Sequence, residues 1–148
     1  MPRPIVTHLI DDLTAGGVTR VLDHLLTAPE MAGFADHRLK RVAPGTTCIG
    51  HIGGDIIVSH LAVSWRMLPA FVSLRVCNPH ARLIHVEHSY TEGFVALNVP
   101  RKSRFEALLR LSYRLFDTVV AVSEAQRDWL ERARLVRPRR LTVIPSCV

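Results

Sequence analysis

The stretch of sequence that decides the fold is residues 5–26, IVTHLIDDLTAGGVTRVLDHLL. An apolar run over 5–10 is followed by the glycine pair Gly16–Gly17 and then by apolar residues at helical spacing. This order predicts a buried strand, a tight turn and an amphipathic helix over 18–26. A glycine pair lets backbone approach a ligand closely, and the unpaired N–H groups of a helix start favour an anion such as phosphate. A turn that binds nothing fits the same residues, so both interpretations stay open.

Composition places the chain among ordinary globular proteins. Its 148 residues are enough for one domain with a core, with 48% hydrophobic and 22% charged residues. No apolar run is long enough to span a bilayer, and the first residues lack the features of a signal peptide. We therefore expect a cytoplasmic protein. The three cysteines, Cys48, Cys77 and Cys147, are widely spaced, so neither a disulfide framework nor a zinc site is predicted.

The chain is basic, with a net charge of +6 and a pI of about 10.0. Such a surface suits nucleic acid, anionic lipid or phosphorylated substrates. The arginines are spread along the sequence without interleaved aromatic residues, which disfavours a dedicated nucleic-acid module. A basic group, Arg101, Lys102 and Arg104, comes at the start of a predicted helix. It is either the solvated side of a core-packing helix or a patch for an anionic membrane surface or acceptor.

Strands and helices alternate along the sequence. This alternation predicts an α/β fold, a doubly wound Rossmann-like parallel sheet in a single domain. Ligands bind such sheets at the carboxyl ends of the strands, near the switch in strand order. We predict strands at 5–10, 37–42, 55–60, 82–87, 117–122 and 141–144, helices at 18–26, 64–76, 103–116 and 124–133, and loops at 43–54 and 91–100.

Polar residues gather just after the predicted strands, where a ligand site is expected. The run HVEH over 85–88 invites a metal interpretation, but His85 and His88 are an odd number of residues apart and point to opposite faces of a strand. We expect His85 to be a core histidine and His88, at the strand end, to be either a ligand contact or a satisfied side chain. Ser123 and Glu124 are explained by a helix cap with an acidic first turn.

Four segments together resemble the N-terminal domain of retaining glycosyltransferases of family 4, which have the two-domain GT-B architecture. No single motif decides this resemblance; the order and spacing of the segments do. The resemblance implies transfer of a sugar from a nucleotide-sugar to a sugar, lipid or polysaccharide acceptor, without a cofactor or metal. The segments are LTAGGVTRVLDHLL (13–26), DIIVSHLA (55–62), RLIHVEHSYTEG (82–93) and FDTVVAVSEAQRDWLERARLVRPRRLTVIPSCV (116–148).

The resemblance also assigns roles to residues. Gly16 and Gly17 would lie against the donor diphosphate, and His88 would be the catalytic-site residue near the transferred sugar. Substrate-binding residues on the acceptor side would be Asp12, Thr14, Tyr90, Ser123, Glu124 and Arg127. A peripheral location at the inner face of the membrane, through the basic group at 101–104, is a further expectation.

The chain departs from the family pattern in three places. Thr19 stands where the family often has an acidic residue, and Ser146–Cys147 replaces the usual Asn-Gly. The donor-site pair of glutamates in the C-terminal half has no counterpart, since Glu124 and Glu131 have neither the spacing nor the position. We therefore expect residues 1–148 to be the acceptor-side half of a GT-B fold, inactive alone, without the C-terminal donor-binding domain. A non-catalytic module that pairs with a separate donor-binding domain is the alternative.

Overall fold

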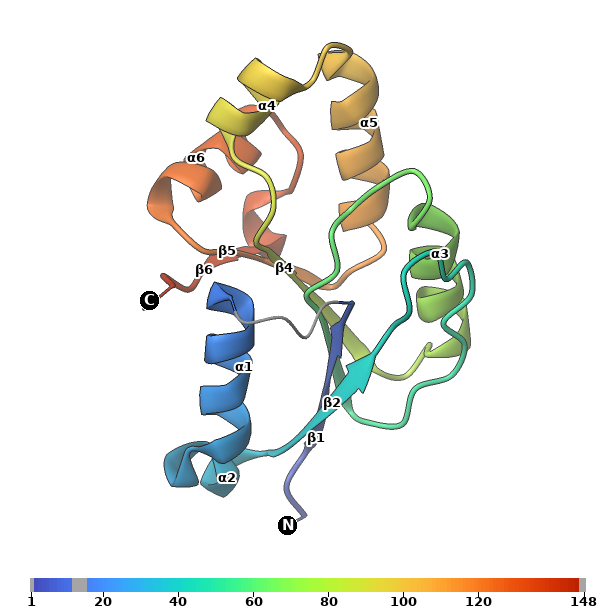
Figure 1. The fold of residues 1–148 in the computed structure, drawn as a ribbon, viewed down its shortest axis with the longest axis vertical. Coiled ribbons are helices and arrows are strands. Elements are labelled where there is room, and N and C mark those ends of the chain that lie inside the picture. Colours follow the sequence, from blue (N-terminus) through green and yellow to red (C-terminus); the bar gives the residue numbers. More distant parts are fainter. Residues whose placement is uncertain (1, 12–15, 147–148) are drawn as a thin grey trace.

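The computed structural model describes residues 2–11 and 16–146 as a single parallel α/β layer structure (Figure 1). Six strands form one sheet in the order β2-β1-β3-β4-β5-β6, with every neighbouring pair parallel. This order confirms the predicted doubly wound sheet and puts the switch point between β1 and β3. The strands are β1 (Ile5–Ile10), β2 (Asp36–Arg41), β3 (Ile56–Ser59), β4 (Arg82–Glu87), β5 (Thr118–Ala121) and β6 (Leu141–Val143).

The helices connect these strands and cover the sheet. Helices α2 and α4 and the 3-10 turn η1 are short, with six, seven and three residues. The full set is α1 (Gly17–Thr27), α2 (Pro29–Phe34), α3 (Leu68–Cys77), α4 (Glu92–Asn98), α5 (Lys102–Tyr113), α6 (Glu124–Arg132) and η1 (Pro138–Arg140).

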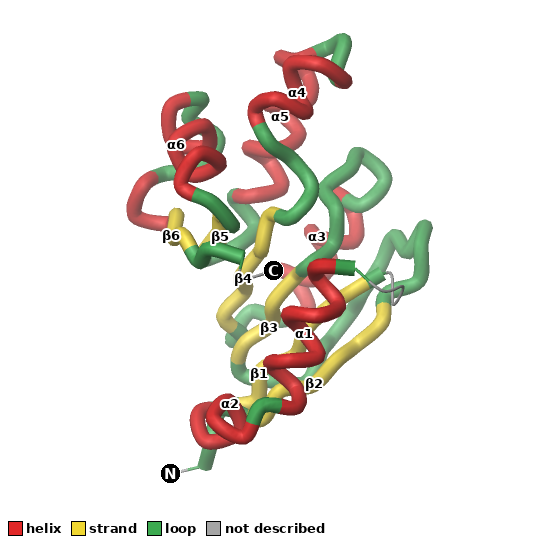
Figure 2. Tube along the Cα trace, turned by 60° about the vertical axis from the view of Figure 1, so that its left-hand side comes forward, coloured by secondary structure: helices red, strands yellow, loops and turns green. Residues whose placement is uncertain are grey.

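The two faces of the sheet are covered unequally. One face, under α3, α5 and α6, carries the main core, which includes Leu9, Ile57 and Phe71. The opposite face has a small cluster of Val6, Ala35 and Val58 near α1 and α2. Figures 1 and 2 show α1 and α2 over the β1–β2 end of the sheet, on the other side from α3. Within α1 only Leu22 is fully buried, so the apolar stripe predicted for this helix is covered in part.

One element contradicts the sequence prediction. The segment 91–100, expected to be a loop, contains helix α4. Thr91 begins it, since its side-chain oxygen accepts a hydrogen bond from the Phe94 backbone N–H at 3.2 Å. Helix α2, which begins at Pro29 directly after α1, was also not predicted. No helix in the described ranges is long and apolar enough to cross a membrane.

Candidate functional site

A small cavity lies at the carboxyl edge of the sheet, beside the β1–β3 switch point. Its volume is about 240 Å³. The glycine pair Gly16–Gly17 and the first turn of α1 form one wall, and His60, His88 and Ser89 form the facing wall. Gly16, at the N-cap of α1, is extended and has no side chain that could cap the helix, so the backbone at the start of α1 meets the cavity directly. The structure thus brings the predicted Gly16, Gly17 and His88 to one site.

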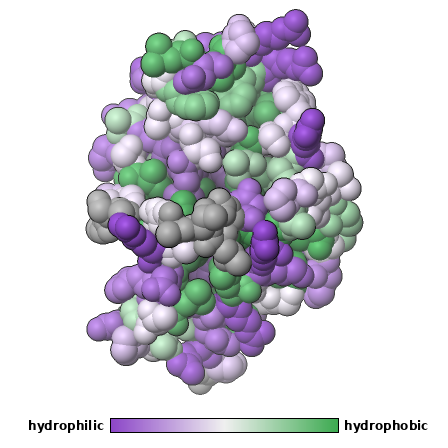
Figure 3. All heavy atoms as spheres, viewed as in Figure 1, coloured by the Kyte–Doolittle hydropathy of each residue, from purple (hydrophilic) through white to green (hydrophobic). Residues whose placement is uncertain are grey.

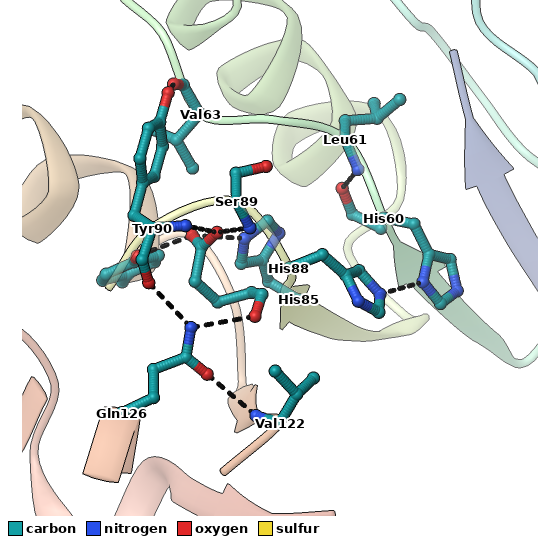
Figure 4. Close-up of polar contacts among 12 residues, drawn as sticks. His60, Leu61, Val63, His85, His88, Ser89, Tyr90, Val122 and Gln126 are labelled. Atoms are coloured by element: carbon teal, nitrogen blue, oxygen red, sulfur yellow. Dashed lines mark hydrogen bonds and ion pairs between the residues drawn. The ribbon is translucent and has the colours of Figure 1, made fainter. Parts of the chain in front are cut away.

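Four histidine side chains form a continuous row that ends at this cavity. His37 Nδ1 lies 3.0 Å from His8 Nε2, His8 Nδ1 lies 3.0 Å from His60 Nε2, and His60 Nδ1 lies 3.0 Å from His88 Nε2. Successive rings are stacked, with centroids 5.2–5.3 Å apart. We call these four residues the histidine row; Figure 4 shows its end at His60 and His88.

The register of the sheet explains the row. His37 is aligned with Val6, two residues before His8, and His8 is aligned with Val58, two residues before His60. Parallel neighbours in register share a face, and residues two apart on a strand share a face. The same step leads from His60, directly after β3, to His88, directly after β4. The row therefore crosses the sheet diagonally from β2 to β4. It approaches the carboxyl edge by two residues per strand, on the face of the sheet that α1 covers.

Three side chains of the row, those of His8, His60 and His88, are neutral at physiological pH. Burial, with the neighbouring His37 adding to it, lowers the pKa of His8 from 6.5 to about 4. Burial, with His8 and His88 adding to it, lowers the pKa of His60 to about 2. The pKa of His88 is also below its ordinary value because burial outweighs the attraction of the Glu87 carboxylate. Among the described residues no group of three or more His, Cys, Asp or Glu side chains has an arrangement that could hold a metal ion.

On the other face of β4, the buried carboxylate of Glu87 organises the loop that carries His88. Its Oε1 accepts hydrogen bonds from the backbone N–H groups of Ser89 and Tyr90 at 2.8 and 3.2 Å. Its Oε2 accepts from the Tyr113 hydroxyl at 2.7 Å and from His85 Nε2 at 3.2 Å. The strand end and the following turn are therefore fixed by one side chain.

The charge of Glu87 is stabilised where it lies. Burial raises the pKa of this carboxyl, but the hydrogen bonds from His85, Tyr113 and Ser89 outweigh burial and bring the pKa below its ordinary value. Burial, reinforced by Glu87, raises the pKa of the Tyr113 hydroxyl well above its ordinary value. Glu87 is thus an ionised acceptor and Tyr113 a neutral donor at pH 7. The prediction that His85 belongs to the core is confirmed: it is fully buried beside Phe71 and Phe116.

Gln126 joins the same loop to helix α6. Its Nε2 donates to the backbone oxygens of Glu87 and Tyr90 at 3.1 and 2.8 Å. Its Oε1 accepts from the Val122 N–H at 2.8 Å. This buried amide satisfies three backbone groups at the ends of β4 and β5, and it fixes the start of α6 against the loop that carries His88.

The other predicted site residues lie apart from the cavity. Ser123 caps α6 by accepting from the Gln126 N–H at 3.1 Å, as the cap interpretation predicts. Glu124 and Arg127 form an ion pair on the same helix at 2.9 Å. Tyr90 donates its hydroxyl to the Val63 carbonyl at 2.7 Å. None of these four is among the cavity-lining residues, and Asp12 and Thr14 lie outside the described residues.

Sequence reasoning missed His8 and His37 as neighbours of the site. The signal was present: His8 is two residues before the end of β1, and His60 and His88 follow β3 and β4. What the sequence does not supply is the stagger between strands, which sets whether these rings meet. Asp11, which also lines the cavity, was visible as a polar residue directly after β1.

A larger cavity, of about 730 Å³, lies at the opposite edge of the sheet. It is lined by five arginines from the ends of α5 and α6 and from the segment before β6. Cations suit this position because the carbonyl ends of helices are negative. Arg110 demonstrates this by donating to the backbone oxygens of Ala133 and Arg134 at 2.9 and 3.2 Å. Arg110 thus has a structural role, and none of the predicted site residues that the structure describes lines this cavity, so the candidate site is placed at the smaller one.

The fold is that of a parallel α/β domain with a cavity at a topological switch point, walled on one side by a glycine turn. Comparison with known families places it further: the chain belongs to Glycosyltransferase Family 4, whose model matches residues 34–148. The matched part contains His88 and Gln126 and begins after Gly16–Gly17 and α1. No curated protein matches the chain significantly.

Proposed function

We propose that residues 1–148 form the acceptor-side, N-terminal half of a GT-B glycosyltransferase. The full enzyme would transfer a sugar from a nucleotide-sugar to an acceptor with retained configuration. The observation that carries this proposal is the meeting of Gly16–Gly17, the start of α1 and His88 in one cavity of a chain that belongs to family 4. The start of a helix stabilises negative charge, and a diphosphate leaving group is where charge develops in this reaction.

The proposed roles follow from position. Gly16 and Gly17 would offer backbone N–H groups to the donor diphosphate, and His88 would contact the sugar being transferred. No metal or cofactor is required in this scheme, because the helix start and donated hydrogen bonds carry the electrostatic stabilisation. The acceptor side would be contributed by Asp12, Thr14, Tyr90, Ser123, Glu124 and Arg127.

A charge placed at the glycine turn tests the diphosphate contact. Gly17→Glu adds an acidic residue to the first turn of α1, which has none, so the helix dipole favours it and the fold is retained. The added carboxylate would repel a diphosphate, and we expect at least a tenfold loss of affinity for UDP-glucose or GDP-mannose by calorimetry. Arg20→Glu is the matched control, since Arg20 is in the same turn but outside the cavity lining. Equal affinity of Gly17→Glu and wild type would reject the contact.

We further propose that the donor is held mainly by a second domain. The 148-residue chain should then bind nucleotide-sugars weakly and give no turnover with any of them. Release of nucleoside diphosphate in the presence of an acceptor measures this, with a complete family 4 enzyme as the positive control. Turnover by the 148-residue chain alone would show that the two-domain assignment is wrong.

A second proposal concerns the corner formed by α4 and the start of α5. Exposed apolar side chains lie here beside the basic group: Leu97 is 86% exposed, Phe94 43% and Trp65 43%. The guanidinium of Arg104 lies 5.3 Å from the centre of the Trp65 ring. Figure 3 shows apolar and charged surface together over this end of the molecule. Apolar residues flanked by cations fit an anionic lipid surface, which supports peripheral membrane contact through Arg101, Lys102 and Arg104.

Vesicle sedimentation tests this contact. We expect binding to phosphatidylcholine vesicles that contain phosphatidylglycerol, little binding to phosphatidylcholine alone, and loss of binding at high salt. The triple substitution Arg101→Ser, Lys102→Ser and Arg104→Ser should abolish vesicle binding, and Leu97→Ser should weaken it. Serine at 137, 139 and 140 removes the same charge from the opposite edge and is the matched control. Binding that survives the first triple substitution would contradict the proposal.

A further inference from the structure

We propose that His37, His8 and His60 are positioning residues that fix the tautomer of His88, so that His88 carries its proton on Nδ1 and offers the cavity a hydrogen-bond donor. The inference rests on the geometry of the histidine row in the free chain. It deepens the proposed function, because it states what chemistry His88 presents to a ligand, but it does not depend on sugar transfer.

The three hydrogen-bonded links of the histidine row all run in the same direction. At each of the three links the Nδ1 of one ring meets the Nε2 of the next, from His37 to His88. A neutral imidazole has one N–H donor and one acceptor nitrogen. Three complete hydrogen bonds therefore allow two arrangements only. Either every ring is protonated on Nδ1 and donates toward His88, or every ring is protonated on Nε2 and donates toward His37. Any mixture opposes two donors or two lone pairs.

The histidine row has a buried end, at His37. His37 Nε2 is buried and has no hydrogen-bond partner. If every ring were protonated on Nε2, this end would be a buried N–H group without an acceptor, and such orphan donors are rare in proteins. If every ring is protonated on Nδ1, the same atom is a bare nitrogen and the unshared proton lies at His88 instead.

Charged groups surround the other end of the row, at His88. The Glu87 carboxylate, from β4, attracts positive charge at His88, and Asp11, after β1, lines the same cavity. Both favour an N–H at the His88 end of the row. His85 acts in the opposite sense from β4, and so does the positive start of α1, which faces the cavity. Two carboxylates thus favour an N–H on His88, whereas one helix end and one histidine disfavour it. The buried end of the row, at His37, also favours protonation of every ring on Nδ1.

The chemical consequence is specific. His60 Nδ1 donates to His88 Nε2, so Nε2 is occupied as an acceptor and Nδ1 is the nitrogen that carries hydrogen. Because His88 is neutral and its Nε2 is already occupied, His88 acts as a hydrogen-bond donor to a ligand oxygen and not as a base. Under the proposed function that oxygen would belong to the sugar or the diphosphate of the donor.

Nitrogen NMR of the ligand-free chain tests the inference directly. In a long-range ¹H–¹⁵N spectrum at neutral pH, we expect the Nδ1 of His88, His60 and His8 to resonate as protonated nitrogens and their Nε2 as unprotonated ones. His80, which is exposed and outside the row, should show the averaged shifts of a freely exchanging ring. A His88 protonated on Nε2, or on both nitrogens, would overturn the proposal.

A variant shows whether the row causes the tautomer. His60→Phe keeps a ring in place but removes the donor to His88; we expect the two His88 nitrogens to move toward averaged shifts and the midpoint of its titration to rise. His80→Phe should change neither. If His60→Phe folds and His88 keeps its tautomer, the row does not fix it and the proposal fails. If the variant does not fold, the wild-type spectrum still decides. Neither readout needs transferase activity, so failure here and failure of the proposed function are distinguishable.

Discussion

At the scale of single residues, the candidate site depends on the buried carboxylate of Glu87. Its two oxygens accept four hydrogen bonds, two of them from the backbone of the turn that follows His88. A carboxylate is suited to this position because it is acceptor-only, whereas an amide has one acceptor end and one donor end. The position of His88 is therefore set by a side chain on the opposite face of the sheet.

Glu87→Gln should destabilise the chain by about 3 kcal/mol. The amide N–H₂ of glutamine would lie against groups that themselves donate, and these groups would lose their acceptor. Urea unfolding at neutral pH measures this loss. The pKa of Glu87 is below its ordinary value, so its contribution is present above the unfolded value of 4.5 and is lost on acidification below it. Glu92→Gln is the control, because Glu92 pairs with Arg132 at an exposed site. Equal stability of the two variants would contradict this account.

At the scale of elements, each strand that the sequence predicts is present. Near-continuous β-branched runs such as that of β3 are strong strand signals, whereas the polar edge strand β2 has no such run. The opposite faces of His85 and His88 were predictable for the same reason, since parity follows from the strand alone. Helix α4 was not predictable in this way, because its seven residues include a glycine and are too few to show a helical periodicity. Its start also depends on the Thr91 cap. The histidine row needed the stagger of four strands, which is a tertiary property.

The turn before β3 contains a glycine that cannot be replaced freely. Gly54 has a φ of +140°, and a Cβ there would lie 2.9 Å from Thr7 Oγ1 on β1. We expect Gly54→Ala to lower the free energy of unfolding by roughly 1–3 kcal/mol.

Gly33 in α2 provides the matched comparison, because nothing lies within 4 Å of its added Cβ and its φ is not positive. Gly33→Ala should raise the free energy of unfolding by about 0.5–1 kcal/mol, through helix propensity. Thermal unfolding of the two variants side by side measures both signs. Destabilisation by both would mean that the loss at Gly54 says nothing about its contact with β1.

At the scale of the whole molecule, the histidine row links stability to pH. The pKa of His8 falls from 6.5 to about 4 and that of His60 to about 2, so the unfolded chain binds these protons first. Stability is therefore fully present above pH 6.5 and decreases as the pH falls below it, toward about 4 for the contribution of His8 and about 2 for that of His60. For His8 alone the difference is on the order of 3 kcal/mol.

Urea unfolding as a function of pH measures this dependence. We expect a steep acid limb in the wild type and a shallower one in His60→Phe, since one titrating group has been removed. His80→Phe, an exposed substitution outside the row, is the control variant. An unchanged slope in His60→Phe would show that the row is not the source of the acid sensitivity.

The unequal coverage of the two sheet faces has a consequence for local opening. Helix α5 buries Leu108, Leu109, Ser112 and Tyr113, whereas α1 buries Leu22 alone. Amide hydrogens of α1 should therefore exchange through partial opening at a free energy well below that of global unfolding, while those of α5 approach the global value. Mass spectrometry after deuterium labelling measures both. Because α1 also forms the glycine wall of the cavity, a ligand held there should slow exchange in α1 first.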